Sequence, residues 1–323
     1  MRVQADYSRP ASPVHRPTDV TKSLAAAVAL AVVAGQPAPR GPDNPDVPGD
    51  LVRIGEHRLF ISCTGGAGTG PTVLLEAGGG GSSGEWSVVR EQLGAAVRTC
   101  AYDRAGLGRS EQGPRPRTMR QEVLELHALL DAARQAPPYV MVGQSIGGLL
   151  VRLYADAYPA EVAGVVLVDP THESGVLGSG RYGGIVRLRE KATGRPVPAP
   201  RLSQAGGTPD DPNADYMAEE FQAMYLARQR VPQPLRQRPL IVLAAGRRPA
   251  PPPGVSQELW TSIRDERDEL VRDLAGLSDN SRFVRVDGSG HAIHRDEPAA
   301  VAEAIRTVYD AVVTRARLRQ APG

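Results

Sequence analysis

The fold is decided by the stretch Tyr139-Val140-Met141-Val142-Gly143-Gln144-Ser145-Ile146-Gly147-Gly148-Leu149-Leu150. Its first four residues are apolar without alternation, which is typical of a strand covered on both faces in a parallel sheet. An apolar helical run follows Ser145, with no breaker before Pro159. Small residues on both sides of Ser145 allow a sharp turn from strand to helix, and such a turn presents its serine as a nucleophile.

The same Gly-x-Ser-x-Gly pattern occurs a second time, at Gly80-Gly81-Ser82-Ser83-Gly84. Ser82 follows four glycines rather than a strand, so nothing is expected to hold its side chain rigidly. The strand before Ser145 and the helix after it therefore favour Ser145 over Ser82.

Strands and helices alternate along the chain on both sides of this turn. Strands are predicted at 52–54, 59–63, 72–75, 97–102, 139–142, 165–168, 240–243 and 282–286, and helices at 122–136, 146–158, 214–230, 257–277 and 298–318. Such alternation implies βαβ units and an α/β fold with a doubly wound, mostly parallel sheet.

A serine nucleophile requires a base, and the chain has six histidines. His291 follows the last predicted strand through Gly288-Ser289-Gly290, at the sheet edge where parallel strands end and ligands bind. His291 is therefore the predicted base. His294 is the competing candidate, three residues further along.

Asp169 is the predicted acid that orients the imidazole, because it directly follows the strand at 165–168. The strand at 240–243 is followed by no carboxylate before Glu258. Glu258 and Asp265 remain alternatives, and Asp169 could instead cap its strand. The glycine run before Ser82 can bring backbone N–H groups close to an oxyanion, so Gly79 and Ile146 are the predicted oxyanion donors.

Composition excludes several classes of protein. The 323 residues are 41% hydrophobic and 23% charged, with a net charge of +2. Nucleic-acid binding would need a clustered basic face, and the arginines are instead spread along the chain. No zinc-ligand spacing occurs, and the glycine run lacks the ending of a phosphate-binding loop. We therefore expect a small-molecule substrate and neither a metal nor an organic cofactor.

The N-terminal part of the chain resembles a targeting segment. A basic leader precedes an apolar run at 24–34, which is too short for the roughly 20 residues of a stable membrane span. We expect 1–34 to be a signal peptide of a secreted or cell-envelope protein, and 35–50 to be a disordered linker. The alternative is a cytoplasmic enzyme with an Ala-rich tail.

The segment 172–238 interrupts the alternation within the expected domain, 51–318. It is rich in Gly and Pro and contains a single helical run. Insertions of this length within a compact domain are typically lids, so 172–238 is the predicted cap over the site.

Three motifs together resemble the α/β-hydrolase superfamily, with serine esterases and lipases among its members. They are the turn at Ser145, the stretch Tyr102-Asp103-Arg104-Ala105-Gly106-Leu107-Gly108-Arg109-Ser110, and Gly288-Ser289-Gly290-His291. The resemblance covers about 51–313 and implies an eight-stranded sheet with a cap after strand six. The chain departs from the family where Ala77-Gly78 replaces the usual His-Gly, and where the acid follows strand six rather than seven.

The resemblance also gives the two cysteines a role. The family pairs strand two, which carries Cys63, with strand four, which carries Cys100. A disulfide between them is therefore expected, and buried free thiols are the alternative. Such a bond would agree with export.

The expected activity is hydrolysis of carboxylic esters through an acyl-enzyme. The alternatives are another serine-dependent reaction (C–C bond or amide hydrolysis, or a peroxidase-type reaction) and a non-catalytic ligand-binding protein on the same fold. The sequence specifies neither the acyl and alcohol groups nor an oligomeric state.

Overall fold

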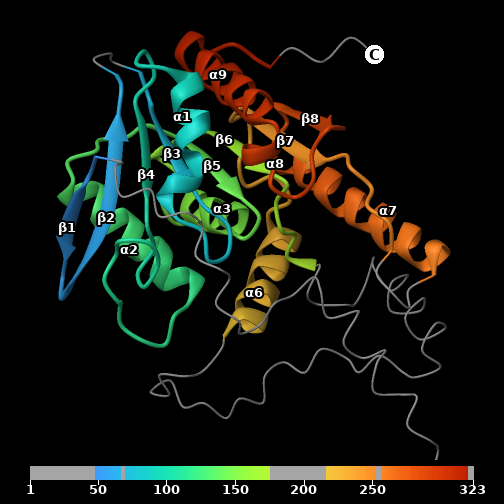
Figure 1. Cartoon of the computed structure of the whole chain (residues 1–323), viewed down its shortest axis with the longest axis horizontal. Helices are drawn as coiled ribbons and strands as arrows, with labels where there is room; N and C mark the ends of the chain where they lie inside the picture. Colours follow the sequence, from blue (N-terminus) through green and yellow to red (C-terminus); the bar gives the residue numbers. More distant parts are fainter. Residues whose placement is uncertain (1–47, 67–69, 175–215, 252–255, 319–323) are drawn as a thin grey trace, which may run out of the picture.

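The computed structural model describes residues 48–66, 70–174, 216–251 and 256–318 (Figure 1). Eight strands form one sheet in the order β1-β2-β4-β3-β5-β6-β7-β8. β2 is antiparallel to both of its neighbours, and all other neighbours are parallel. The strands are β1 Asp50–Ile54, β2 His57–Thr64, β3 Thr72–Glu76, β4 Thr99–Tyr102, β5 Tyr139–Gln144, β6 Val162–Val168, β7 Leu240–Ala245 and β8 Ser281–Val286. The predicted doubly wound, mostly parallel sheet is confirmed.

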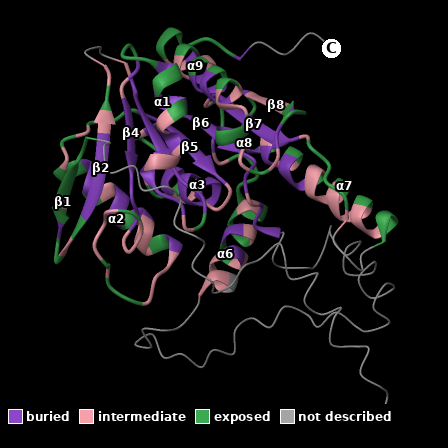
Figure 2. Cartoon of the chain, viewed as in Figure 1, coloured by how far each residue is buried: buried purple, intermediate pink, exposed green. Residues whose placement is uncertain are grey.

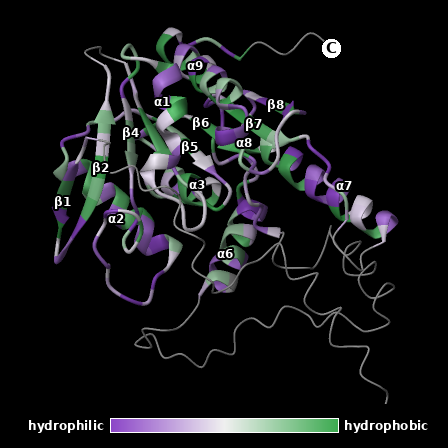
Figure 3. Cartoon of the chain, viewed as in Figure 1, coloured by the Kyte–Doolittle hydropathy of each residue, from purple (hydrophilic) through white to green (hydrophobic). Residues whose placement is uncertain are grey.

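Helices cover both faces of the sheet and enclose two apolar cores (Figure 1). One core lies under α1 and α9, and the other under α2, α3 and α6. Every residue of β3, β5 and β7 is buried, which explains their apolar runs without alternation (Figures 2 and 3). The helices are η2 Ser83–Trp86, α1 Ser87–Leu93, α2 Met119–Ala132, α3 Gly147–Ala157, α6 Met217–Arg230, α7 Gln257–Asp273, η4 Leu274–Leu277, α8 Ile293–Asp296 and α9 Pro298–Thr314.

Three local differences from the prediction stand out. β1 begins at Asp50, which pairs with Ile61, so the predicted linker extends one residue too far. η2 and α1 form a helical segment at 83–93 that the sequence analysis did not predict. The predicted helix 257–277 is α7 followed by the 3-10 turn η4.

The predicted signal peptide, 1–34, lies outside the described residues, and so does the linker up to residue 47. Of the predicted cap, the structure describes 172–174 and 216–238. Within the part of the chain that the structure describes, no helix has both the length and the apolar character needed to cross a membrane.

Buried ion pairs hold α6 against the body of the domain. Arg228 of α6 lies 3.1 Å from the Glu173 carboxylate and 2.7 Å from that of Asp273 at the end of α7. Glu173 is fully buried and also pairs with Arg152 of α3 at 2.7 Å. Phe221 of α6 completes the contact by inserting into the core. The last part of the predicted cap is thus joined to the segment that follows β6.

Cys63 and Cys100 face each other across the antiparallel pair β2–β4 and form a disulfide. The bond joins the β1–β2 hairpin to the parallel part of the sheet. It closes a loop with a sequence separation of 37 residues.

A buried charge cluster lies where β3 and β4 end. Glu76 is the last residue of β3 and accepts hydrogen bonds from the Tyr102 hydroxyl and the Arg104 guanidinium. Arg104 also pairs with Glu122 of α2, with its Nε 3.6 Å from the carboxylate. Burial raises the pKa of Glu76 to about 7, because desolvation of its carboxylate outweighs the opposing effects of Arg104 and Tyr102.

The disulfide leads to the first prediction. Replacing both cysteines with serine should lower the free energy of unfolding by about 3–4 kcal/mol, since the open chain regains the entropy of a loop of this length. Guanidinium denaturation of the two proteins measures the difference. A thiol titration of the unfolded wild type should find no free thiol, and equal stability of the two proteins would contradict the prediction.

The second prediction concerns Glu76 and pH. Because its pKa is higher in the folded state than the usual 4.5, the folded protein binds the proton more tightly than the unfolded chain. The free energy of unfolding should therefore fall as pH rises from about 4.5 to 7, by up to about 3 kcal/mol from this group.

Thermal unfolding at pH 5 and pH 8 tests this. Glu76→Gln should remove much of the wild-type loss of stability, whereas Glu56→Gln, at an exposed carboxyl in the β1–β2 turn, should leave it unchanged. The same pH dependence in all three proteins would refute the assignment.

Candidate active site

Ser145 lies at the turn between β5 and α3, in the middle of the sheet. Its φ of +54° falls in the left-handed region, which non-glycine residues rarely adopt. A Cβ on Gly143 would lie 2.4 Å from the Gly147 carbonyl oxygen, and one on Gly147 would lie 2.6 Å from that of Ala77. Only glycine fits at these two positions, so the spacing of the motif reflects direct backbone contact.

The turn is held to β6 by backbone hydrogen bonds. The Ser145 amide donates to the Val168 carbonyl at 3.2 Å, and the Thr171 amide donates to the Ser145 carbonyl at 3.0 Å. Asp169 lies between these two partners. Backbone hydrogen bonds therefore join the turn that carries the predicted nucleophile to the segment that carries the predicted acid.

The structure brings Ser145, His291 and Asp169 together. His291 Nε2 lies 3.0 Å from Ser145 Oγ, and His291 Nδ1 lies 2.6 Å from Asp169 Oδ2. A carboxylate can only accept a hydrogen bond, so Nδ1 carries the proton and Nε2 is free to accept from the serine hydroxyl. This is the arrangement that a serine nucleophile and its general base require.

Asp169 is fully buried, whereas the His291 side chain is 57% exposed. Burial by itself would raise the pKa of Asp169, but the His291 hydrogen bond and the nearby Arg267 charge together hold that pKa below its usual range. The Ala245 amide also donates to Oδ1 at 3.0 Å. The aspartate is thus kept ionised beneath the imidazole.

Arg267 was not predicted from the sequence. It extends from α7 and its Nη2 donates to Oδ2 of Asp169, the oxygen that also accepts from His291. The two residues are 98 positions apart, and no local pattern indicates their contact.

The alternative candidates lie elsewhere. Asp265 pairs with Arg248 at 2.7 Å, and Glu258 is exposed in the first turn of α7. His294 is buried against Trp86 and lies 3.5 Å from the Glu85 carboxylate. Ser82 is the buried N-cap residue of η2. Among the described residues, none of these four forms a hydrogen bond or ion pair with Ser145 or His291.

The glycine loop lies against the serine turn. A Cβ on Gly78 would lie 3.3 Å from Ser145 Cβ, and one on Gly79 would lie 3.8 Å from Ile146 Cγ2. Within the described ranges, the amides of Gly79 and Ile146 donate no hydrogen bond to another protein group. Both predicted donors therefore lie near Ser145 with free N–H groups.

Arg104 holds the other side of this loop. It is buried, and it donates from Nη1 to the Ala77 carbonyl at 2.8 Å and from Nη2 to the Gly78 carbonyl at 2.6 Å. In the sequence, Arg104 stands out only as part of a family motif, and no local pattern predicts these contacts.

Two contacts restrain the loop that carries His291. The Gln144 side-chain amide donates to the His291 carbonyl at 3.2 Å, and the Gly290 amide donates to Asp296 at 2.8 Å. The residue before the serine and the helix after the histidine thus both hold the backbone that carries the imidazole.

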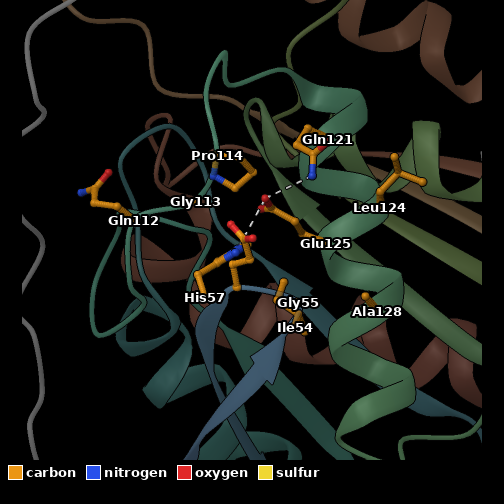
Figure 4. Close-up of a pocket in the computed structure, with 11 residues that line it drawn as sticks. Ile54, Gly55, His57, Gln112, Gly113, Pro114, Gln121, Leu124, Glu125 and Ala128 are labelled. Atoms are coloured by element: carbon orange, nitrogen blue, oxygen red, sulfur yellow. Dashed lines mark hydrogen bonds and ion pairs between the residues drawn. The ribbon is translucent and has the colours of Figure 1, made fainter. Parts of the chain in front are cut away.

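A hollow of about 650 Å³ lies elsewhere on the domain, between the β1–β2 turn and α2 (Figure 4). Within it, His57 and Gln121 both point toward Glu125. Its lining includes none of the residues around Ser145, so the hollow is separate from the candidate active site.

Comparisons with known proteins agree with this fold. An uncharacterised *Bacillus subtilis* protein, YqjL, is 29% identical over 249 residues, which cover 77% of this chain and 87% of the relative. An esterase from *Thermogutta terrifontis* has a similar structure, with a TM-score of 0.55, 21% identity, and coverage of 82% of this chain and 98% of its own.

A hydrolase from *Pseudomonas aeruginosa* has a TM-score of 0.52 and 18% identity, and the match covers 80% of this chain and 97% of that one. The profile of the alpha/beta hydrolase family matches residues 73–304. The sheet order, the serine turn and this match across most of the domain show that the chain belongs to the alpha/beta hydrolase family.

Proposed function

We propose that this protein is a serine hydrolase that cleaves carboxylic esters through an acyl-enzyme. The observation that carries the proposal is the continuous chain of contacts from Ser145 Oγ through His291 to Asp169, at 3.0 Å and 2.6 Å. The esterase with a similar structure shows that an enzyme acting on esters can be built on this fold.

In the first half of the reaction, Ser145 Oγ attacks the ester carbonyl carbon while His291 Nε2 takes the hydroxyl proton. The carbonyl electron pair moves to oxygen, where the Gly79 and Ile146 amides donate hydrogen bonds to the negative charge. His291 then returns the proton to the departing alkoxide. An alcohol leaves, and the acyl group stays on Ser145.

In the second half, His291 takes a proton from water, and the resulting hydroxide attacks the acyl carbon. The same two amides stabilise the second oxyanion, and His291 protonates Ser145 Oγ as the acid leaves. Asp169 stabilises the imidazolium in both halves. Its ionised state, supported by Arg267 and the Ala245 amide, suits it to this role.

The segment 172–238 is proposed to cover the site and to select the substrate. Insertions of this length in compact domains commonly form binding lids. The anchoring of α6 through Arg228 and Glu173 supports this, because it places one end of the segment next to the residues that follow Asp169.

The proposal predicts the behaviour of three variants on a panel of short and long p-nitrophenyl esters. Ser145→Ala and His291→Gln should each lower kcat by about 10⁴-fold or more, and Asp169→Asn by about 10⁴-fold, because each disrupts the same proton relay. Steady-state rates measure the loss. A fluorophosphonate probe should label the wild type but not Ser145→Ala.

Ser82→Ala is the matched control, since Ser82 occupies the same sequence motif but its hydroxyl has no hydrogen-bond partner among the described residues. It should still be labelled and should still hydrolyse the preferred ester. Labelling that persists in Ser145→Ala, or a wild type that accepts no ester on the panel, would rule out the proposed activity.

We further infer that the protein is exported. In residues 1–34, a basic leader is followed by an apolar run, as in a signal peptide. The Cys63–Cys100 disulfide also supports export, because such bonds persist in oxidising compartments.

Export predicts the mature N-terminus. Full-length protein expressed in a bacterial host should be recovered from the envelope or the medium with its sequence starting close to residue 35, since small residues at the cut follow the apolar run. Edman degradation or intact mass identifies the start. Recovery of the uncleaved chain from the cytoplasm alone would contradict export.

A further inference from the structure

We propose that Arg104 is a positioning residue for catalysis: by binding the Gly78 carbonyl, it aims the Gly79 amide at the oxyanion. This inference rests on the proposed hydrolase function. It assigns a role to a residue that touches neither Ser145 nor His291 among the described contacts.

The geometry of one peptide unit connects the two groups. The Gly78 carbonyl and the Gly79 N–H belong to the same planar trans peptide, so they point in opposite directions. Arg104 Nη2 holds the carbonyl oxygen at 2.6 Å from the side of β4. Fixing that oxygen fixes the direction of the Gly79 N–H. The loop lies against Ser145 and Ile146 at this point, because a Cβ on Gly78 would lie 3.3 Å from Ser145 Cβ and one on Gly79 would lie 3.8 Å from Ile146 Cγ2.

The glycine loop requires such a restraint. Gly78, Gly79, Gly80 and Gly81 follow one another, and glycine has more backbone conformations to lose than any other residue. Within the loop itself, the Gly81 amide donates to the Gly78 carbonyl, but at 3.2 Å this bond is longer than the one from Arg104. A charged donor makes the stronger contact.

A guanidinium is suited to this task because its five donors form a rigid fork. Nη1 reaches both the Ala77 carbonyl and Glu76, Nη2 reaches the Gly78 carbonyl, and Nε faces Glu122. Two consecutive carbonyls are therefore held by a single buried group. A lysine ammonium, as a point donor on a flexible stem, cannot hold both in a fixed orientation.

The position of Arg104 is itself fixed. It follows Asp103, whose carboxylate accepts from the Ser83 amide at 2.6 Å and from the Arg109 amide at 2.8 Å. Glu76 anchors the guanidinium from β3, the strand that leads directly into the glycine loop. The contact between Arg104 and the loop is thus supported from β3, β4 and η2.

The experiment measures ester hydrolysis by the full-length protein and its affinity for a trifluoromethyl ketone. In the adduct, Ser145 Oγ bonds to the ketone carbon, the proton passes to His291, and the carbonyl electron pair forms an oxyanion. The affinity of the protein for the ketone therefore depends on the hydrogen bonds that the oxyanion donors make. The test variant is the double substitution Arg104→Met with Glu76→Gln, which removes the buried pair without leaving Glu76 as an unpaired charge.

The double variant should lower kcat by about 10²–10³-fold, as expected for the loss of an oxyanion donor. KM should stay within about threefold, because the substrate carbonyl carries little charge before reaction. The ketone affinity should fall in parallel with kcat. Glu76→Gln alone, which keeps an oxygen acceptor for Arg104, should lose less in kcat and in ketone affinity than the double variant.

Arg117→Met is the matched control for a merely structural role. Arg117 is also partly buried and pairs with Glu125 at 2.6 Å, but it makes no contact with the glycine loop within the described residues. It should lower the melting temperature while leaving kcat and ketone affinity within about threefold.

Arg104→Lys covers the case in which the double variant does not fold, because it keeps a positive charge beside Glu76 and Glu122. It should melt near the wild-type temperature and still lose at least about tenfold in kcat and in ketone affinity. Values within about threefold of wild type for a folded Arg104 variant would overturn the inference. If, in addition, Ser145→Ala is inactive and unlabelled, the hydrolase proposal survives that result.

Discussion

The close contact of two backbones at the start of α3 determines the rest of the site. Gly147 packs against the Ala77 carbonyl at the end of β3, and Gly143 packs against Gly147. There is no space for a side chain in either contact, and Ser145 adopts a left-handed conformation at the carboxyl end of β5. The same contact brings the glycine loop next to the serine. The proposed nucleophile and the proposed oxyanion donors are thus placed by a single packing constraint.

The site also depends on two arginines from different elements. Arg267 extends from α7, binds Asp169 and keeps its carboxylate charged. Arg104 follows β4 and binds two carbonyls of the glycine loop. Neither is a member of the serine, histidine and aspartate set. Both act on groups that must be buried and still polar, and such groups need a partner to offset their desolvation.

The features that the sequence predicted are those with a local cause. A strand that leads directly into a serine between glycines fits few structures other than a strand-turn-helix. The buried strands are predicted by their long apolar runs. Asp169 and His291 could be chosen because each follows a predicted strand. Parallel strands end at a common edge of the sheet, so residues that follow them lie close together. The placement of Cys63 opposite Cys100 needed the strand pairing of a known family.

The features that the sequence did not predict depend on side chains that meet through tertiary packing. Arg267 and Asp169 are 98 residues apart, and the chain contains 38 basic residues without a pattern that singles out this one. The helical segment at 83–93 was missed because α1 is only seven residues long and follows a run of glycines. Its stability comes from burying Val89 and Leu93 rather than from its own propensity.

The hydrogen bonds that tie Ser145 to Val168 and Thr171 make the serine and the aspartate parts of one rigid frame. The imidazole belongs to a different part of the chain, the loop after β8. Gln144 and Asp296 hold the backbone of this loop. The hydrogen bond from His291 to Asp169 joins the imidazole to the same frame, so the serine turn and the histidine loop share one support. The His291 side chain is 57% exposed, so solvent reaches the imidazole while its aspartate partner stays buried.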